Sequence, residues 1–204
     1  MSLLGSSDMK TKVYFPSTRY LLFTIILLSS SLLPTLANNN GKSNAIAQTT
    51  KPFLTVEKPI LGFKISYPSD WNITDNDFFI SFKAPSNTTA LVTFSIINLS
   101  SYSKSNLTLE QYTSNEINAM KSAQSKKVGN TFELVESKPY LLSGQPGHEI
   151  AFLNGTKVYN YTKTLLVWSI VDGKIYQIGY TAPASEYSSY IQTVFYMIDS
   201  FRLL

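Results

Sequence analysis

Between residues 63 and 181 the chain carries the patterns of seven short β-strands. In the first of them, Phe63, Ile65 and Tyr67 alternate with polar residues, as in a strand with one buried face. Residues 165–171 are almost continuously apolar, which indicates a central strand covered on both faces. The predicted strands are 63–67, 78–83, 90–98, 132–136, 146–153, 157–171 and 174–181.

Short connections predict that these strands pair antiparallel. Asp172-Gly173 separates the last two strands, and both residue types tolerate the positive φ of a tight hairpin turn. Pro85-Ser86-Asn87 predicts a second hairpin, between residues 78–83 and 90–98. Residues 67–71 are expected to form a turn after Pro68 that folds Trp71 back onto the core.

Two segments show the period of an amphipathic α-helix. Thr108 and Gln111 fit a capping box, in which each side chain accepts from the other residue's backbone N–H, and a helix should follow as far as about Gln124. A second apolar stripe predicts a helix over residues 183–201. With strands between the two helices in sequence, the pattern indicates an α+β fold with helices packed on an antiparallel sheet.

Residues 1–37 are expected to be a signal peptide or a membrane anchor. Lys10, Lys12 and Arg19 precede an apolar run over residues 20–36, and this order is typical of an export signal. The run is also just long enough to span a bilayer, which takes roughly 17–25 residues.

The leader leaves two alternatives, cleavage or a transmembrane tether. Pro34 and three successive serines favour cleavage, after Ala37 or Ala47. Residues 38–52 are polar and are interpreted as a flexible linker, and residues 53–204 as a single domain. The domain is therefore expected to be exported, either extracellular or at the cell surface.

Charge and composition narrow the function classes. The net charge is +4, but from residue 51 onward thirteen basic residues stand against twelve acidic ones, so no nucleic-acid partner is indicated. There is no phosphate-binding glycine loop or dinucleotide motif, and no nucleotide partner is expected. The chain has no cysteine, which excludes disulfides, thiolate metal sites and a cysteine nucleophile.

His148 is the only histidine, so any Ser-His-Asp mechanism would have to use it. It shares a predicted strand face with Ile150 and Phe152, and no Gly-x-Ser-x-Gly motif occurs in the chain. We interpret His148 as structural or surface-exposed. The alternative is a metal or catalytic role together with Glu149. No catalytic residue is assigned.

Asp70, Asp75 and Asp77 are the candidate metal ligands, because clustered carboxylates suit a hard cation such as Ca²⁺. Counted as a calcium loop from Asp70, the sixth residue is Asp75 instead of Gly and the twelfth is Ser81 instead of Glu, so the cluster is not an EF-hand. A solvated turn is the alternative. No other cofactor is indicated.

Six Asn-x-Ser/Thr triplets mark candidate glycosylation sites at the surface, although an Asn- and Ser-rich composition also produces such triplets. They begin at Asn72, Asn87, Asn98, Asn106, Asn154 and Asn160.

Three segments resemble the PsbP-like domain family. Residues 62–71, Gly-Phe-Lys-Ile-Ser-Tyr-Pro-Ser-Asp-Trp, are similar to the family's opening Gly-(Phe/Tyr)-x-(Ile/Phe)-x-Tyr-Pro-x-x-Trp. Residues 144–147, Gly-Gln-Pro-Gly, resemble its Gly-x-Pro-(Ala/Gly) step, and residues 180–201 resemble its closing helix. The resemblance covers roughly residues 53–204, and we interpret its matched residues as structural.

The resemblance implies an α/β/α sandwich with a central antiparallel sheet flanked by helices. The best-known family members are non-enzymatic extrinsic subunits on the lumenal side of photosystem II that help to retain calcium and chloride. By analogy, this chain is expected to be an exported, non-enzymatic accessory or binding protein at the outer face of the cell membrane, with a protein or membrane-complex partner.

Two further functions stay open from the sequence. One is an extracytoplasmic domain that binds a small apolar ligand between sheet and helix, or that has a structural role at the surface. The other is a hydrolase that uses Asp or Glu side chains.

Overall fold

The computed structural model describes residues 51–76, 79–85, 88–101, 107–125, 130–156 and 160–204. The predicted leader and nearly all of the predicted linker lie outside these ranges. The chain divides into two units, and the described residues belong to the second, residues 42–204. Within the described ranges no helix is both long and apolar enough to cross a membrane.

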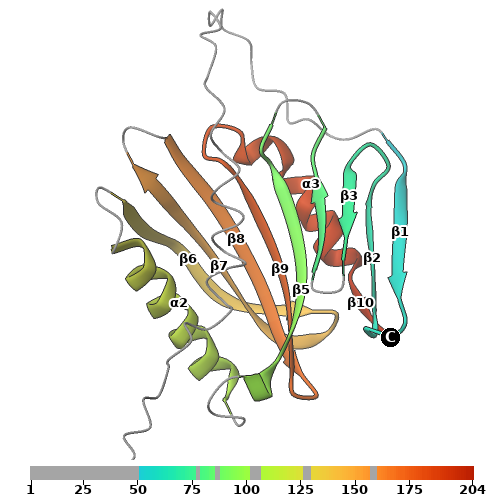
Figure 1. The fold of residues 1–204 in the computed structure, drawn as a ribbon, viewed down its shortest axis with the longest axis horizontal. Helices are drawn as coiled ribbons and strands as arrows, with labels where there is room; N and C mark the ends of the chain where they lie inside the picture. The colour runs from blue at the N-terminus through green and yellow to red at the C-terminus, as the bar shows by residue number, and fades with distance from the viewer. Residues whose placement is uncertain (1–50, 77–78, 86–87, 102–106, 126–129, 157–159) are drawn as a thin grey trace, which may run out of the picture. The chain divides into compact units, whose positions relative to one another are not determined.

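A seven-stranded antiparallel sheet forms the centre of the domain (Figure 1). In chain order its strands are β3 (Asn72–Asp75), β4 (Phe79–Lys83), β5 (Leu91–Asn98), β6 (Thr131–Leu142), β7 (Gln145–Thr156), β8 (Asn160–Val171) and β9 (Lys174–Pro183). They lie side by side in the order β3-β4-β5-β9-β8-β7-β6, so β6 is an edge strand.

A second, smaller sheet and two α-helices complete the described part of the domain. The small sheet has the order β1-β2-β10, with β1 (Phe53–Lys58), β2 (Phe63–Pro68) and β10 (Arg202–Leu203). The helices are α2 (Leu109–Ser125) and α3 (Tyr187–Ser200), and the 3-10 turn η1 (Leu99–Ser101) follows β5.

One face of the central sheet packs against α3 and the small sheet. Tyr180 of β9 lies on this face, its hydroxyl donates to the backbone oxygen of Tyr187 at 3.0 Å, and the two rings are 4.9 Å apart. Phe63 of β2 contacts Phe94 of β5, with ring centroids 4.0 Å apart. These buried apolar side chains form the main core.

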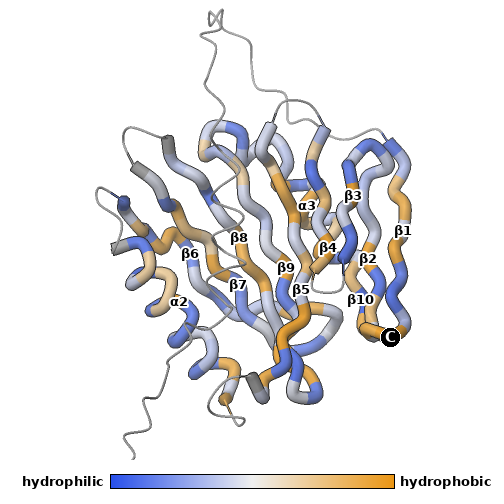
Figure 2. Tube along the Cα trace, viewed as in Figure 1, coloured by the Kyte–Doolittle hydropathy of each residue, from blue (hydrophilic) through white to orange (hydrophobic). Residues whose placement is uncertain are grey.

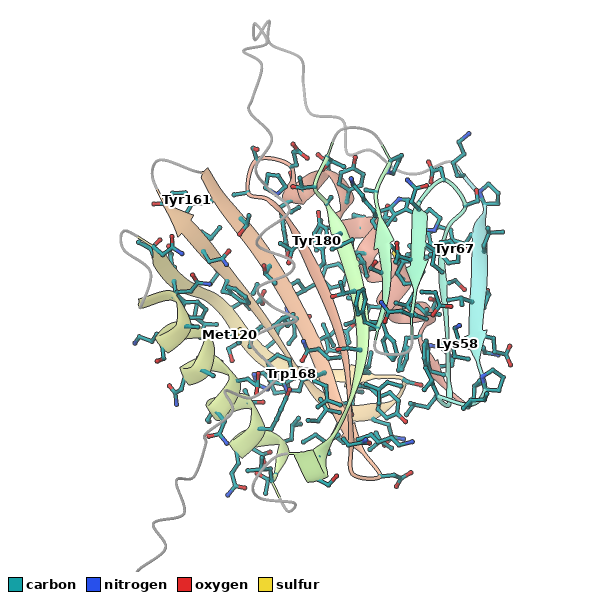
Figure 3. The ribbon with its side chains drawn as sticks, in the orientation of Figure 1. Lys58, Tyr67, Met120, Tyr161, Trp168 and Tyr180 are labelled. Carbon is teal, nitrogen blue, oxygen red and sulfur yellow. The ribbon has the colours of Figure 1, made fainter. Side chains whose placement is uncertain are left out.

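The opposite face of the sheet is covered by α2. Trp168 of β8 is fully buried and meets the ring of Tyr112 edge-on at 5.8 Å, and its indole N–H donates to Thr113 Oγ1 at 3.3 Å. Met120 lies on the same helix (Figure 3). Helices on both faces make the expected α/β/α sandwich, so the predicted fold class is confirmed.

Three local structures predicted from the sequence are also confirmed: a capping box, a hairpin turn and the burial of Trp71. Gln111 N donates to Thr108 Oγ1 at 3.2 Å and Thr108 N to Gln111 Oε1 at 3.1 Å, which is the capping box. Asp172 and Gly173 both have positive φ, 49° and 71°, in the turn that joins β8 and β9. Trp71 is buried behind the turn after β2.

Gly147 of β7 lies close beside the backbone of the neighbouring strand β8, and this close approach provides a test of the fold. A Cβ at this position would come within 2.4 Å of the carbonyl oxygen of Trp168. Gly147→Ala should therefore lower the free energy of unfolding by about 1–3 kcal/mol or more, because backbone atoms cannot yield as side chains do. Urea unfolding followed by tryptophan fluorescence measures the loss.

Gln192→Ala, at an exposed position of α3, is the matched control and should change stability by less than about 0.5 kcal/mol. Equal stability of the Gly147→Ala variant and the parent would show that β7 and β8 are not packed as described.

Candidate functional site

Glu149 is a carboxylate buried on the α3 face of the central sheet. The residue is only 1% exposed, and it stands between Lys138 of β6 and Val167 of β8 in the strand register. Burying a charged group among apolar side chains is costly unless it is paired and hydrogen-bonded. The groups that pair with the Glu149 carboxylate therefore determine the chemistry of this part of the sheet.

Lys138 bridges two carboxylates. Its Nζ lies 3.1 Å from Glu149 Oε1 and 2.7 Å from Glu136 Oε1, and the side chains of Lys138 and Glu136 are about half exposed. Hydrogen bonds to Glu136 and then to Glu149 raise the pKa of Lys138, so the ammonium group stays charged. We name Glu136, Lys138 and Glu149 the Glu149 cluster.

A β-bulge in β6 brings the Glu149 cluster together. The register shifts between Leu134, which pairs with Phe152, and Glu136, which pairs with Ala151. The extra residue, Val135, reverses the alternation of the strand from that point on. Glu136 and Lys138 consequently share the α3 face with Glu149.

Two tyrosines border the cluster. Tyr140 donates its hydroxyl to Asp199 Oδ1 of α3 at 3.2 Å, and burial, assisted by Asp199, raises the pKa of Tyr140 to about 12. Burial also raises the pKa of Tyr187, with smaller contributions from Glu149 and Glu136, and Lys163 Nζ lies 4.6 Å from the centre of its ring. Both phenols are therefore neutral at physiological pH.

One oxygen of the cluster is left without a partner in the described part of the chain. Glu149 Oε2 is buried and accepts no hydrogen bond there. A partner outside the domain can reach the half-exposed Lys138 and Glu136 of the cluster, whereas this buried oxygen is out of its reach. Within the described residues, no group of three or more acidic or histidine side chains is arranged to hold a metal ion.

His148 lies on the opposite face of the same strand, the face covered by α2. Its Nε2 is 2.8 Å from Ser137 Oγ, and its ring stacks on Trp168 with centroids 6.0 Å apart. Desolvation lowers the pKa of His148, whereas Glu110 and Glu149 oppose the shift. Because successive residues of a strand point to opposite faces, Glu149 and His148 do not form one site.

Two of the three candidate calcium ligands lie within the described residues. Asp75 is exposed and forms an ion pair with Lys58, whereas Asp70 Oδ1 is buried without a hydrogen-bond partner in the described part. Asp77 lies outside the described residues. The calcium site thus stays a prediction.

The candidate glycosylation sites differ in exposure. Asn72 and Asn98 are exposed. Asn154 is buried, and its Oδ1 accepts a hydrogen bond from the Thr162 hydroxyl, so the expectation of a surface position is wrong for Asn154. Asn160 begins β8, and Asn87 and Asn106 lie outside the described residues.

Sequence reasoning missed the Glu149 cluster. One signal was present, since Glu149 stands between His148 and Ile150 in a strand that the pattern assigned to the core. Its partner Lys138 lies beyond the predicted end of the preceding strand at Glu136. The contact between Lys138 and Glu149 becomes apparent only from the register of β6 against β7.

Comparisons with known proteins support the fold. No family model and no curated protein sequence matches the chain. Among solved structures, the cyanobacterial PsbP protein (CyanoP) of Synechocystis sp. PCC 6803 superimposes with a TM-score of 0.57 at 14% identity, over 81% of this chain and 98% of that one. The domain therefore has a PsbP-like fold.

Two other solved structures are less similar. A Bacteroides thetaiotaomicron VPI-5482 protein matches with a TM-score of 0.47 at 14% identity, over 74% of this chain and 48% of that one. LpqN, involved in cell envelope biogenesis of Mycobacterium tuberculosis, matches with a TM-score of 0.41 at 9% identity, over 76% and 86%. Such low TM-scores do not establish a shared fold, and no functional argument rests on either protein.

The Glu149 cluster yields a stability prediction. Lys138→Met removes the cation beside a buried carboxylate and should lower the free energy of unfolding by about 1–3 kcal/mol. Glu136→Gln removes only a half-exposed partner of the same lysine and should cost less than about 0.5 kcal/mol. Chemical unfolding of the two variants in parallel measures both, and equal losses would contradict the burial of Glu149.

His148 yields a pH prediction. Its pKa in the folded protein lies below the ordinary value of 6.5, so the unfolded chain takes up a proton first as the pH falls. The stability that neutral His148 contributes is therefore present above about pH 6.5 and is lost below it. His148→Gln should flatten the decline in unfolding free energy between pH 6.5 and 5.5, and an unchanged slope would contradict the lowered pKa.

Proposed function

We propose that the protein is an exported, non-enzymatic accessory protein that acts at the outer face of the cell membrane by binding a partner. The observation that carries this proposal is the PsbP-like fold, which extends over 98% of the cyanobacterial PsbP chain. The opening segment 62–71 resembles the PsbP-like family as well. Fold and local sequence thus point to the same kind of protein.

The leader supports the location. Residues 20–36 form an apolar run behind three basic residues, which is the order of an export signal or an anchor. The domain that follows has no cysteine, so its stability does not depend on the redox state of the compartment.

The arrangement of ionisable groups supports a binding role more than turnover. Ser137 and His148 form a hydrogen-bonded pair, but Ser137 is exposed on the edge strand β6, where water is not excluded. Glu149 is engaged by Lys138 on the other face of the sheet. These groups are not convergent on one reacting atom, as acid-base catalysis requires.

Strand β6 offers the surface for a partner. It carries the half-exposed Glu136 and Lys138 on its α3 face, Leu134, 39% exposed, on its α2 face, and the bulge residue Val135, 48% exposed, between them. Apolar side chains with a charged rim are typical of protein interfaces. We place the partner contact on this strand.

The proposal is tested on intact cells and with purified protein. Protease added outside intact cells should degrade the domain, and the purified protein should not hydrolyse ester, peptide or glycoside substrates. A cytoplasmic protein of the same cells is the control for lysis.

Two results would overturn the proposal. One is protection of the domain until the cells are lysed, which would place it inside. The other is hydrolysis that disappears in both Ser137→Ala and His148→Ala variants while circular dichroism shows that they remain folded.

A further inference from the structure

The turn between β1 and β2 presents large apolar side chains to solvent. Its apex is Ile60, which is 99% exposed, followed by Leu61 at 37%. Exposed turns are usually built from Gly, Asn, Asp, Ser or Pro, and a β-branched aliphatic residue at the tip gains nothing from packing. These two side chains are therefore available for contact with a partner outside the domain.

The backbone of this turn is well defined. The N–H groups of Leu61 and Gly62 both donate to the carbonyl oxygen of Lys58, at 3.0 and 2.9 Å. Gly62 has a φ of 77°, a left-handed conformation that glycine adopts without strain. Ile60 is thus held outward by a hydrogen-bonded turn.

A third apolar side chain joins the turn from the far end of the sequence. Leu204 N donates to the Gly62 carbonyl at 2.9 Å, directly after β10 pairs with β2, and Leu204 is 56% exposed. Figure 2 shows hydrophobic residues together at this end of the domain, beside the point marked C. We name Ile60, Leu61 and Leu204 the apolar apex.

Basic side chains stand next to the apolar apex. Lys64 and Arg202 are directly opposite each other on β2 and β10, one register step from the Phe63–Leu203 pair. Glu57 faces Lys64 from β1, so the apex carries more positive than negative charge on these strands. Aliphatic side chains next to lysine and arginine are typical of segments that enter the headgroup region of a membrane.

We propose that the apolar apex inserts into the interfacial layer of a lipid bilayer with an anionic surface. The inference rests on the proposed location at the outer face of the membrane, and it identifies which end of the domain faces the lipid. A second copy of the chain is a poorer occupant, because a stable protein interface uses roughly 20–30 residues a side. Insertion into lipid requires only a few aliphatic side chains.

The absence of cysteine allows a direct test. The full chain with Ile60→Cys is labelled with an environment-sensitive fluorophore and added to vesicles of phosphatidylcholine with phosphatidylglycerol. The label takes the place of the Ile60 side chain at the tip of the turn, so on insertion its emission should shift to the blue and it should be shielded from iodide. Gln192→Cys, at an exposed position of α3, is the matched control and should stay open to iodide.

Two further arms separate the sources of binding. Vesicles of phosphatidylcholine alone should shield the label at position 60 less than anionic vesicles do. Lys64→Gln in the Ile60→Cys chain should reduce this difference, by about fivefold in the lipid concentration required. Circular dichroism checks that each labelled variant is folded.

Each remaining outcome is decisive. A chain that sediments with the vesicles while the label at position 60 stays fully quenched by iodide would overturn the inference and leave the proposed function intact. Shielding that depends on protein concentration without vesicles would also overturn it, in favour of self-association. Failure of the proposed location would instead appear in the protease experiment on cells, which does not involve the apex.

Discussion

The described domain depends on one contact among three phenylalanines. Phe63 from β2, Phe94 from β5 and Phe201 at the end of α3 lie with ring centroids 4.0, 5.3 and 6.1 Å apart, and all three are buried. Aromatic side chains of this size dominate the energy of a core. The cluster joins the small sheet, the central sheet and the last helix, and it thereby fixes both the apolar apex and the side of the sheet that α3 covers.

Packing on one face and polar pairing on its border have different roles in this arrangement. The apolar rows beneath α3 provide the stability, while Glu149 lies at their border, where Lys138 compensates its charge. Buried ion pairs contribute little net stability, but they disfavour alternative arrangements that would separate the charges. The Glu149 cluster is therefore better understood as a determinant of the β6 register and of surface chemistry than as a source of stability.

Much of the fold could be predicted from the sequence because its strongest signals are local. The turn at Asp172-Gly173, the capping box at Thr108 and the apolar strand at 165–171 each specify structure within a few residues. Strand β3 was missed because all four of its residues are exposed, which leaves no alternating pattern. Strands β1 and β10 were missed because they are ordered by pairing with β2, across a tight turn and from the opposite end of the domain.

The candidate site could not be predicted for a related reason. The contact between Lys138 and Glu149 depends on a bulge, and a bulge is a property of two strands together. The bulge at Val135 therefore sets which face the second half of β6 presents. If Val135 paired in a regular ladder, Glu136 and Lys138 would turn toward α2 and leave Glu149 alone in the core, so the two-against-one pairing at this point matters more than the identity of the side chain at position 135.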